Sequence, residues 1–190
     1  DISLLSKIPK MKIFAPSSYQ ELQQMLEDSL EIVDGPVAIR WPKTPAPQVE
    51  WEEVGSGTDA RRVNKTSGKK DVCILAAGKM LSEAIEASML LSGIGVTIWD
   101  PRILHPLNQE MLEDAKQHKL VVTIEDGYVE GGFGSSVLGY LNKDNSDCRV
   151  INLGVPLSFH SHNKPDSLLS SFGLDADGIV KTVQQALSEI

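Results

Sequence analysis

The stretch VVTIEDGYVEGGFGSSVLGYL, residues 121–141, decides the fold. An apolar run ends in two acids, a glycine-rich loop follows, and small and apolar residues then continue at helical spacing. This order predicts a buried β-strand, a tight loop and an α-helix, which together form the basic unit of an α/β protein. A glycine loop between a strand and a helix also raises the question of whether it binds phosphate.

The loop lacks the spacing of known phosphate-binding motifs. GGFGSS does not follow G-x-G-x-x-G, and no Lys-Ser or Lys-Thr pair comes after it. The carboxylates of Glu125, Asp126 and Glu130 crowd its entrance, and each would repel an anion by roughly a few tenths to a few kcal/mol. We therefore expect the loop glycines to allow close packing of backbone, with direct ligand contact as the alternative. These glycines are Gly131, Gly132 and Gly134.

The same alternation of apolar runs and amphipathic segments extends on both sides of this stretch. It predicts βαβ units around a mostly parallel sheet. We expect strands at 11–16, 36–42, 71–78, 96–101, 119–126 and 148–154. Helices are expected after Ser17-Ser18, at 80–91, after Asn108, at 133–141, from Pro165 to Gly173, and after Asp175.

The first of these helices has two further predicted features. Gln20 and Glu21 are placed to close a capping box with the preceding serines. Its apolar residues recur at helical spacing, which predicts one buried face. They are Leu22, Met25, Leu26, Leu30 and Val33.

The composition changes between residues 44 and 70. This segment is rich in Pro, Gly, Ser and charge, which is typical of a domain linker. Trp51 suggests that the segment packs on a neighbouring element, and a short strand is the alternative. We therefore expect one domain part at 1–43, a linker at 44–70 and a second domain at 71–190.

Charge and composition limit the possible partners. Residues 1–70 hold ten Lys/Arg and ten Asp/Glu, whereas residues 71–190 hold eight and sixteen. An acidic surface repels phosphate backbones, so we expect no nucleic-acid partner. No apolar run approaches the roughly 20 residues needed to cross a bilayer, so we expect no membrane association. Cys73 and Cys148 lie in predicted strands and are expected to be buried free thiols.

The N-terminus carries no signal-peptide pattern. The first residue is Asp1, and neither a basic nor an apolar leader region follows it. We therefore expect a cytoplasmic protein and a chain that is a fragment of a longer one.

Few residues suggest a ligand site. Arg40 and Lys43 follow a predicted strand, where they could hold an anionic group of a substrate; surface ion pairs are the alternative. His160 and His162 share a face of an extended segment, but spacing suggests no third metal ligand, so packing or exposure is favoured. Glu125 could be a general acid or base, although structural hydrogen bonding is the better explanation.

Several longer motifs nevertheless resemble one enzyme family, the thiamine-diphosphate-dependent transketolase-like enzymes, and within it the 1-deoxy-D-xylulose-5-phosphate synthases, most closely their actinobacterial branch. The motifs occur in the family's order and cover nearly the whole chain. They are DISLLSKIPKMKIFAPSSYQEL (1–22), GPVAIRWPK (35–43), VTIWDPRILHPLNQEML (96–112), VVTIEDGYVEGGFGSSV (121–137) and NLGVPLSFHSHNKPDSLLSSFGLDADGI (152–179).

The resemblance implies a fold and a function. It implies the end of a pyrimidine-binding domain, followed by a C-terminal transketolase-like α/β/α domain in three layers. It also implies an enzyme, active as a homodimer, that condenses pyruvate with glyceraldehyde 3-phosphate and releases CO₂ for isoprenoid biosynthesis. Thiamine diphosphate and Mg²⁺ would be held by segments upstream of Asp1, so this chain would bind neither and would be inactive alone.

The resemblance also implies site residues. Lys43 matches the basic residue that grips the substrate phosphate, usually Arg in other branches, and Arg40 matches a second basic position. No residue of this chain matches a catalytic, metal-binding or cofactor-binding position. Two other functions stay open: the C-terminal part of a transketolase or of a 2-oxoacid dehydrogenase β-subunit, and a non-catalytic interaction or regulatory domain.

Overall fold

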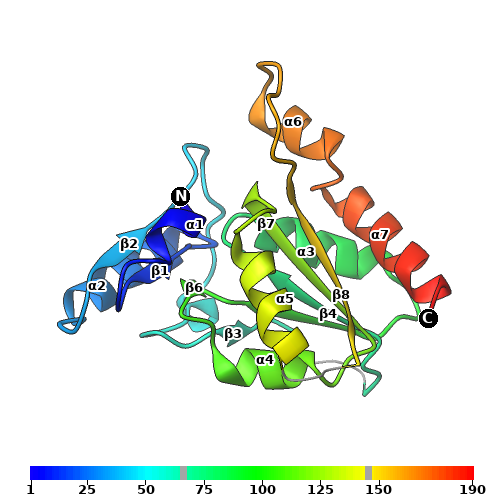
Figure 1. Ribbon diagram of the computed structural model, residues 1–190, viewed down its shortest axis with the longest axis horizontal. Helices are drawn as coiled ribbons and strands as arrows, with labels where there is room; N and C mark the ends of the chain where they lie inside the picture. Colours follow the sequence, from blue (N-terminus) through cyan, green and yellow to red (C-terminus); the bar gives the residue numbers. More distant parts are fainter. Residues whose placement is uncertain (65–67, 144–146) are drawn as a thin grey trace.

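The chain forms two β-sheets with associated helices. The computed structural model describes residues 1–64, 68–143 and 147–190. In Figure 1 a smaller unit, formed mainly by the blue N-terminal residues, lies beside a larger unit that holds most of the green to red residues. The predicted α/β class is confirmed. In the described ranges no helix combines the length and the apolar character needed to span a membrane.

The larger sheet has five strands in the order β3-β5-β4-β7-β8. The last four are parallel to their neighbours, and only the edge strand β3 runs antiparallel. The predicted, mostly parallel sheet is therefore confirmed. The strands are β3 (Arg61–Arg62), β5 (Val96–Asp100), β4 (Val72–Ala76), β7 (Leu120–Tyr128) and β8 (Arg149–Val155).

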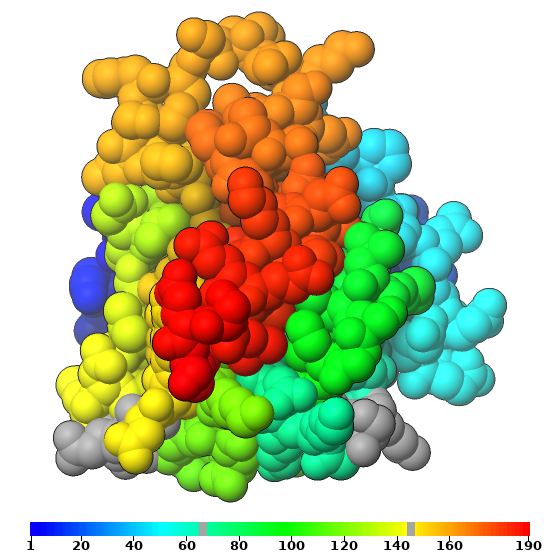
Figure 2. Space-filling model, turned by 90° about the vertical axis from the view of Figure 1, so that its right-hand side faces the viewer, coloured from blue at the N-terminus to red at the C-terminus, as the bar shows by residue number. Residues whose placement is uncertain are grey.

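Helices cover both faces of this sheet, which gives the expected three layers. The central strands β4 and β5 are buried throughout, as expected for strands covered on both faces, and all five residues of β4 are apolar. On one face α3 (Met80–Leu90) and α7 (Ala176–Ser188) share a core with alternate strand residues. Figure 2 shows α7 in red beside α3 in green on this face. On the other face α4 (Gln109–Ala115) and α5 (Phe133–Lys143) pack against the intervening residues.

The smaller sheet contains a strand from the second half of the chain. Its order is β2-β1-β6, with β1 parallel to β2 and antiparallel to β6. Because β6 begins three residues after β5 ends, one short turn joins the two sheets. The strands are β1 (Lys12–Phe14), β2 (Val37–Ile39) and β6 (Ile103–His105); α1 (Ile2–Leu5) and α2 (Tyr19–Leu30) belong to the same unit.

The predicted helix caps are confirmed at three sites. Ser18 accepts from the backbone N–H of Glu21, Asn108 from that of Met111, and Asp175 from that of Gly178. The capping box at the start of α2 does not form, because a buried arginine binds the Glu21 carboxylate instead. The last helices are α6 (Pro165–Ser171), which Gly173 follows at φ +70°, and α7.

Some expectations of burial were wrong. Of the apolar residues of α2 only Met25 is fully buried, while Leu26, Leu30 and Val33 are exposed. Trp51 is 52% exposed and begins a short 3₁₀ helix, η1 (Trp51–Glu53). The segment around it does contact a neighbour, as expected, because the backbone N–H of Gly55 donates to Glu21 of α2. Cys73 is a buried free thiol, as expected, whereas Cys148 is only half-buried.

Candidate functional site

The glycine loop is occupied by a side chain of the protein. The Glu125 carboxylate accepts hydrogen bonds from the backbone N–H groups of Phe133 (3.1 Å) and Gly134 (2.9 Å) at the start of α5. A carboxylate thus sits where a phosphate would bind at a helix N-terminus. Burial raises the pKa of Glu125, while the bonds from Gly134 and Phe133 lower it. The structural role favoured for Glu125 is therefore what the structure shows.

The loop glycines are required by close packing, as expected. A Cβ on Gly132 would come under 3.0 Å from the Glu125 carboxylate and from the backbone oxygen of Tyr128. One on Gly134 would meet Thr123 and Asn152, which hydrogen-bond across β7 and β8. Gly131 has φ +73°, a left-handed conformation that favours glycine.

Glu125→Gln is expected to lower the free energy of unfolding by about 1–3 kcal/mol at pH 7, because the amide keeps one acceptor and turns N–H toward the other backbone donor. Urea titration of the purified chain measures this change. Glu130→Gln is the control, since Glu130 is exposed in the same loop and should change stability by less than about 0.5 kcal/mol. Equal effects of the two substitutions would contradict the assigned role of Glu125.

A cavity of about 510 Å³ lies outside the carboxyl ends of β7 and β8. Its lining includes Asp1, Arg40, Glu125, Asp126, Glu130 and His160. In open α/β sheets ligands bind outside the carboxyl ends of the strands, which is where this cavity lies. Acids outnumber bases among these residues, so the cavity is a poor site for an anion.

The side chain of Arg40 forms two ion pairs at this cavity. Its Nε donates to Asp1 Oδ2 (3.0 Å) and its Nη1 to Asp126 Oδ1 (2.8 Å). The ion-paired alternative weighed for Arg40 is thus what this structure contains. Lys43 lies elsewhere: it is exposed, it does not line this cavity, and the described residues give it no ion pair.

Beside Lys43 lies a second cavity, of about 750 Å³. It lies between the loop that follows β2 and the starts of α2 and α3, and its lining includes Trp41, Pro42 and Thr44. The structure therefore does not bring Arg40 and Lys43 to one cavity. Lys79, at the start of α3, is the basic residue of its lining.

The histidines lie in packing roles or at the surface. His160 Nε2 is 2.9 Å from the backbone oxygen of Pro156, and its ring lies against Phe172 with 4.6 Å between centroids. His162 is exposed. In residues 1–64, 68–143 and 147–190 no group of three or more His, Cys, Asp or Glu could hold a metal ion.

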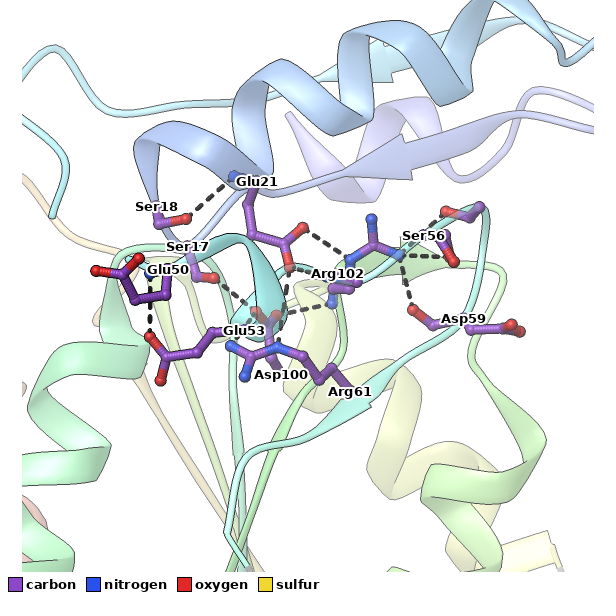
Figure 3. Close-up of polar contacts among 12 residues, drawn as sticks. Ser17, Ser18, Glu21, Glu50, Glu53, Ser56, Asp59, Arg61, Asp100 and Arg102 are labelled. Atoms are coloured by element: carbon purple, nitrogen blue, oxygen red, sulfur yellow. Dashed lines mark hydrogen bonds and ion pairs between the residues drawn. The ribbon is translucent and has the colours of Figure 1, made fainter. Parts of the chain in front are cut away.

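A buried ionic cluster, which the sequence pattern did not predict, lies between the two sheets, and we call it the junction cluster (Figure 3). Arg102, in the turn between β5 and β6, is fully buried and donates from Nε to Glu21 Oε2 (2.8 Å). Its Nη1 donates to the backbone oxygens of Ser56, Gly57 and Asp59. The side chains of the cluster are Ser17, Glu21, Asp28, Arg61, Asp100 and Arg102.

Asp100 completes the cluster at the end of β5. It accepts from Ser17 Oγ (2.6 Å) and from the backbone N–H of Arg102 (2.9 Å). Burial raises the pKa of Asp100 to about 6, and the neighbouring charge of Glu21 adds to the rise. The available signal was the sequence DPR directly after a buried strand, since charges there need partners.

Comparisons with known proteins cover nearly the whole chain. Residues 61–179 match the family model described as transketolase, C-terminal domain. Curated proteins called 1-deoxy-D-xylulose-5-phosphate synthase are 33% identical over 96% of this chain in Corynebacterium glutamicum (strain ATCC 13032), and 36% identical over 94% in Anaeromyxobacter dehalogenans. The chain spans 30% and 29% of the length of these relatives.

A solved structure is similar over nearly the whole chain. It is titled "Split gene transketolase, inactive beta4 tetramer" and aligns with a TM-score of 0.88 and 29% sequence identity. The alignment covers 98% of this chain and 61% of that one. Both sheets of the present chain are therefore included in the likeness.

Proposed function

The chain belongs to the family of transketolase C-terminal domains, and we propose that it forms the C-terminal part of a 1-deoxy-D-xylulose-5-phosphate synthase. The main support for this proposal is the extent of the sequence similarity to these synthases. It covers 94–98% of the chain and so includes the elements α1 to β2 of the smaller unit, which precede the residues matched by the family model. Relatives from Corynebacterium and Mycobacterium support the actinobacterial likeness.

The proposed reaction joins pyruvate to glyceraldehyde 3-phosphate with loss of CO₂. Thiamine diphosphate would supply the electron sink for decarboxylation in such an enzyme. The described residues do not fit this cofactor or its Mg²⁺, because they offer no metal-ligand group and Glu125 occupies the glycine loop. We therefore assign both to other segments of the enzyme.

We assign the substrate phosphate to Lys43. An exposed ammonium without an ion pair among the described residues can accept a new anionic partner. Arg40 already bonds Asp1 and Asp126, so we assign it the weaker role of a neighbouring positive charge. Lys is a point charge that lacks the two-pronged geometry of Arg, so phosphate binding would depend on additional donors.

We further propose that other parts of the enzyme cover the smaller unit. Leu26, Leu30 and Val33 are exposed apolar residues on and just after α2, and the spacing of four residues places Leu26 and Leu30 on one helix face. Such surface is characteristic of protein interfaces. The domain boundaries near residues 43 and 71, a homodimeric assembly and a cytoplasmic location belong to the same proposal.

The test is to assay the complete gene product with pyruvate, glyceraldehyde 3-phosphate, thiamine diphosphate and Mg²⁺. Release of CO₂ that depends on both substrates is expected, whereas the purified 190-residue chain should be inactive. Activity that needs a ketose donor would instead indicate a transketolase, which the similar solved structure keeps as the second candidate. Activity that needs a lipoyl partner would indicate a dehydrogenase subunit.

Lys43→Ala in the active enzyme is expected to raise KM for glyceraldehyde 3-phosphate about tenfold, which corresponds to roughly 1.4 kcal/mol of lost phosphate binding. The KM for pyruvate should change by less than about twofold, because pyruvate carries no phosphate. Steady-state kinetics with each substrate varied measures both constants. Lys181→Ala, at an exposed position of α7, is the matched control. An unchanged KM for the aldehyde would place the phosphate elsewhere.

A further inference from the structure

The junction cluster lies where three separate segments meet. The smaller unit contributes Ser17, Glu21 and Asp28, the segment 55–61 contributes backbone oxygens and Arg61, and the β5–β6 turn contributes Asp100 and Arg102. Figure 3 shows the side chains of Glu21, Arg61, Asp100 and Arg102 converging between α2 and the strands of the larger sheet. The cluster therefore connects the smaller unit to the five-stranded sheet.

The charges of this cluster do not balance. Three carboxylates, on Glu21, Asp28 and Asp100, face the guanidinium groups of Arg61 and Arg102. The side chains of Glu21, Asp100 and Arg102 are at most 1% exposed, so water screens them little. One negative charge is thus in excess in a buried site.

Asp100 is the least well compensated of these carboxylates. The Arg102 guanidinium is bonded to Glu21 and Asp28 and to backbone oxygens, and Arg102 offers Asp100 only its backbone N–H. Arg61 is 3.9 Å from both Glu21 and Asp100, and within the described residues its Nε has no hydrogen-bond partner. Among the described residues, Asp100 therefore faces the Glu21 charge with one ionic partner, the Arg61 guanidinium at 3.9 Å.

We propose that uptake of one proton by Asp100 strengthens the attachment of the smaller unit to the five-stranded sheet. We call this attachment the joint: it is closed when the contacts of the junction cluster are formed and open when they are broken. The geometry has a place for the proton. Ser17 Oγ now donates to Asp100 Oδ2 over 2.6 Å, and a protonated Oδ2 would donate to Ser17 Oγ instead. The contacts of Glu21 with Arg102 and with the backbone N–H of Gly55 remain unchanged.

The direction of the effect follows from linkage. The pKa of Asp100 is about 6 in the closed joint and returns toward its ordinary value of 3.8 when the joint opens and water reaches it. The closed state therefore binds more protons than the open state between these values. Closure is favoured as the pH falls through 6, and this gain is lost as the pH rises again.

Amide hydrogen exchange of the 190-residue chain measures the joint directly. The backbone N–H of Ala15, just after β1, donates to the backbone oxygen of Arg102 in the turn that joins β5 to β6. After correction for intrinsic exchange, its protection factor is expected to rise about tenfold from pH 7.5 to pH 5.0, which is the change that one proton gives over this range with these pKa values. A constant or falling protection factor would overturn the proposal.

Asp100→Asn should remove this pH dependence, since the amide is neutral throughout. Asp34→Asn is the control: Asp34 is exposed and pairs with Lys12, so its replacement should leave the tenfold rise intact. Arg61→Met should move the midpoint above pH 6, because Arg61 lowers the pKa of Asp100. The proposal would be refuted if the protection factor of Ala15 still rose tenfold in Asp100→Asn, or if the midpoint of its pH dependence did not move in Arg61→Met.

The carboxyl ¹³C shift of Asp100 in the unaltered chain gives a test that needs no variant. It is expected to titrate with a midpoint near pH 6. A midpoint near the ordinary value of about 3.9 would also overturn the proposal.

Discussion

Arg102→Met lowers the free energy of unfolding by about 3–5 kcal/mol, which is the largest effect that we expect from a single substitution in this chain. Methionine keeps much of the side-chain volume but removes the cation. Glu21 then loses its 2.8 Å partner, and the oxygens of Ser56, Gly57 and Asp59 lose their shared donor. Buried acceptors and charges without partners are the reason for the loss.

Urea unfolding at pH 7 measures this loss. Arg149→Met provides the matched control, because Arg149 pairs with Glu189 at the surface, where both side chains are at least 40% exposed. Its removal is expected to change stability by less than about 1 kcal/mol. If both substitutions cost the same, the junction cluster would not hold the two units together as described.

Gly132→Ala is expected to destabilise the chain by about 1–3 kcal/mol. The added methyl group would press on the backbone oxygen of Tyr128 and on the Glu125 carboxylate. Neither can move freely, because Glu125 is held by the first amides of α5. The start of the helix would have to shift away from β7.

Gly139→Ala in the same helix is the control, with an effect of opposite sign. A Cβ on Gly139 meets no atom within 4 Å, and alanine is the better helix former. We therefore expect Gly139→Ala to stabilise the chain by about 0.5–1 kcal/mol. Thermal or urea unfolding of both variants measures the change in the free energy of unfolding. If Gly132→Ala left this free energy unchanged, the loop would accept a side chain at this position.

Elements with a clear hydrophobic period could be predicted from the sequence. The long strand β7 is a run of buried residues, and α3 and α7 carry one apolar face each. Ser18, Asn108 and Asp175 marked helix starts because a cap is a local interaction. The role of Glu125 was also accessible, since its partners lie only eight and nine residues ahead.

What the sequence did not reveal depends on contacts between distant residues. Strands β3 and β6 contain two and three residues, too few to show a period, and they exist because β5 and β1 offer a partner edge. Arg102 and Glu21 are 81 positions apart. Arg40 could be proposed for an anion only because its distant partner Asp126 was not visible in the local pattern.

The sharing of β6 between the halves has a consequence for how this protein can be divided. The composition of the polar segment at 44–70 is that of a domain linker, but a cut there would separate β1 from β6. Each product would then expose an unpaired strand edge. The two sheets should therefore be expressed together, and a division of this chain that keeps both sheets intact has to fall outside residues 12–155.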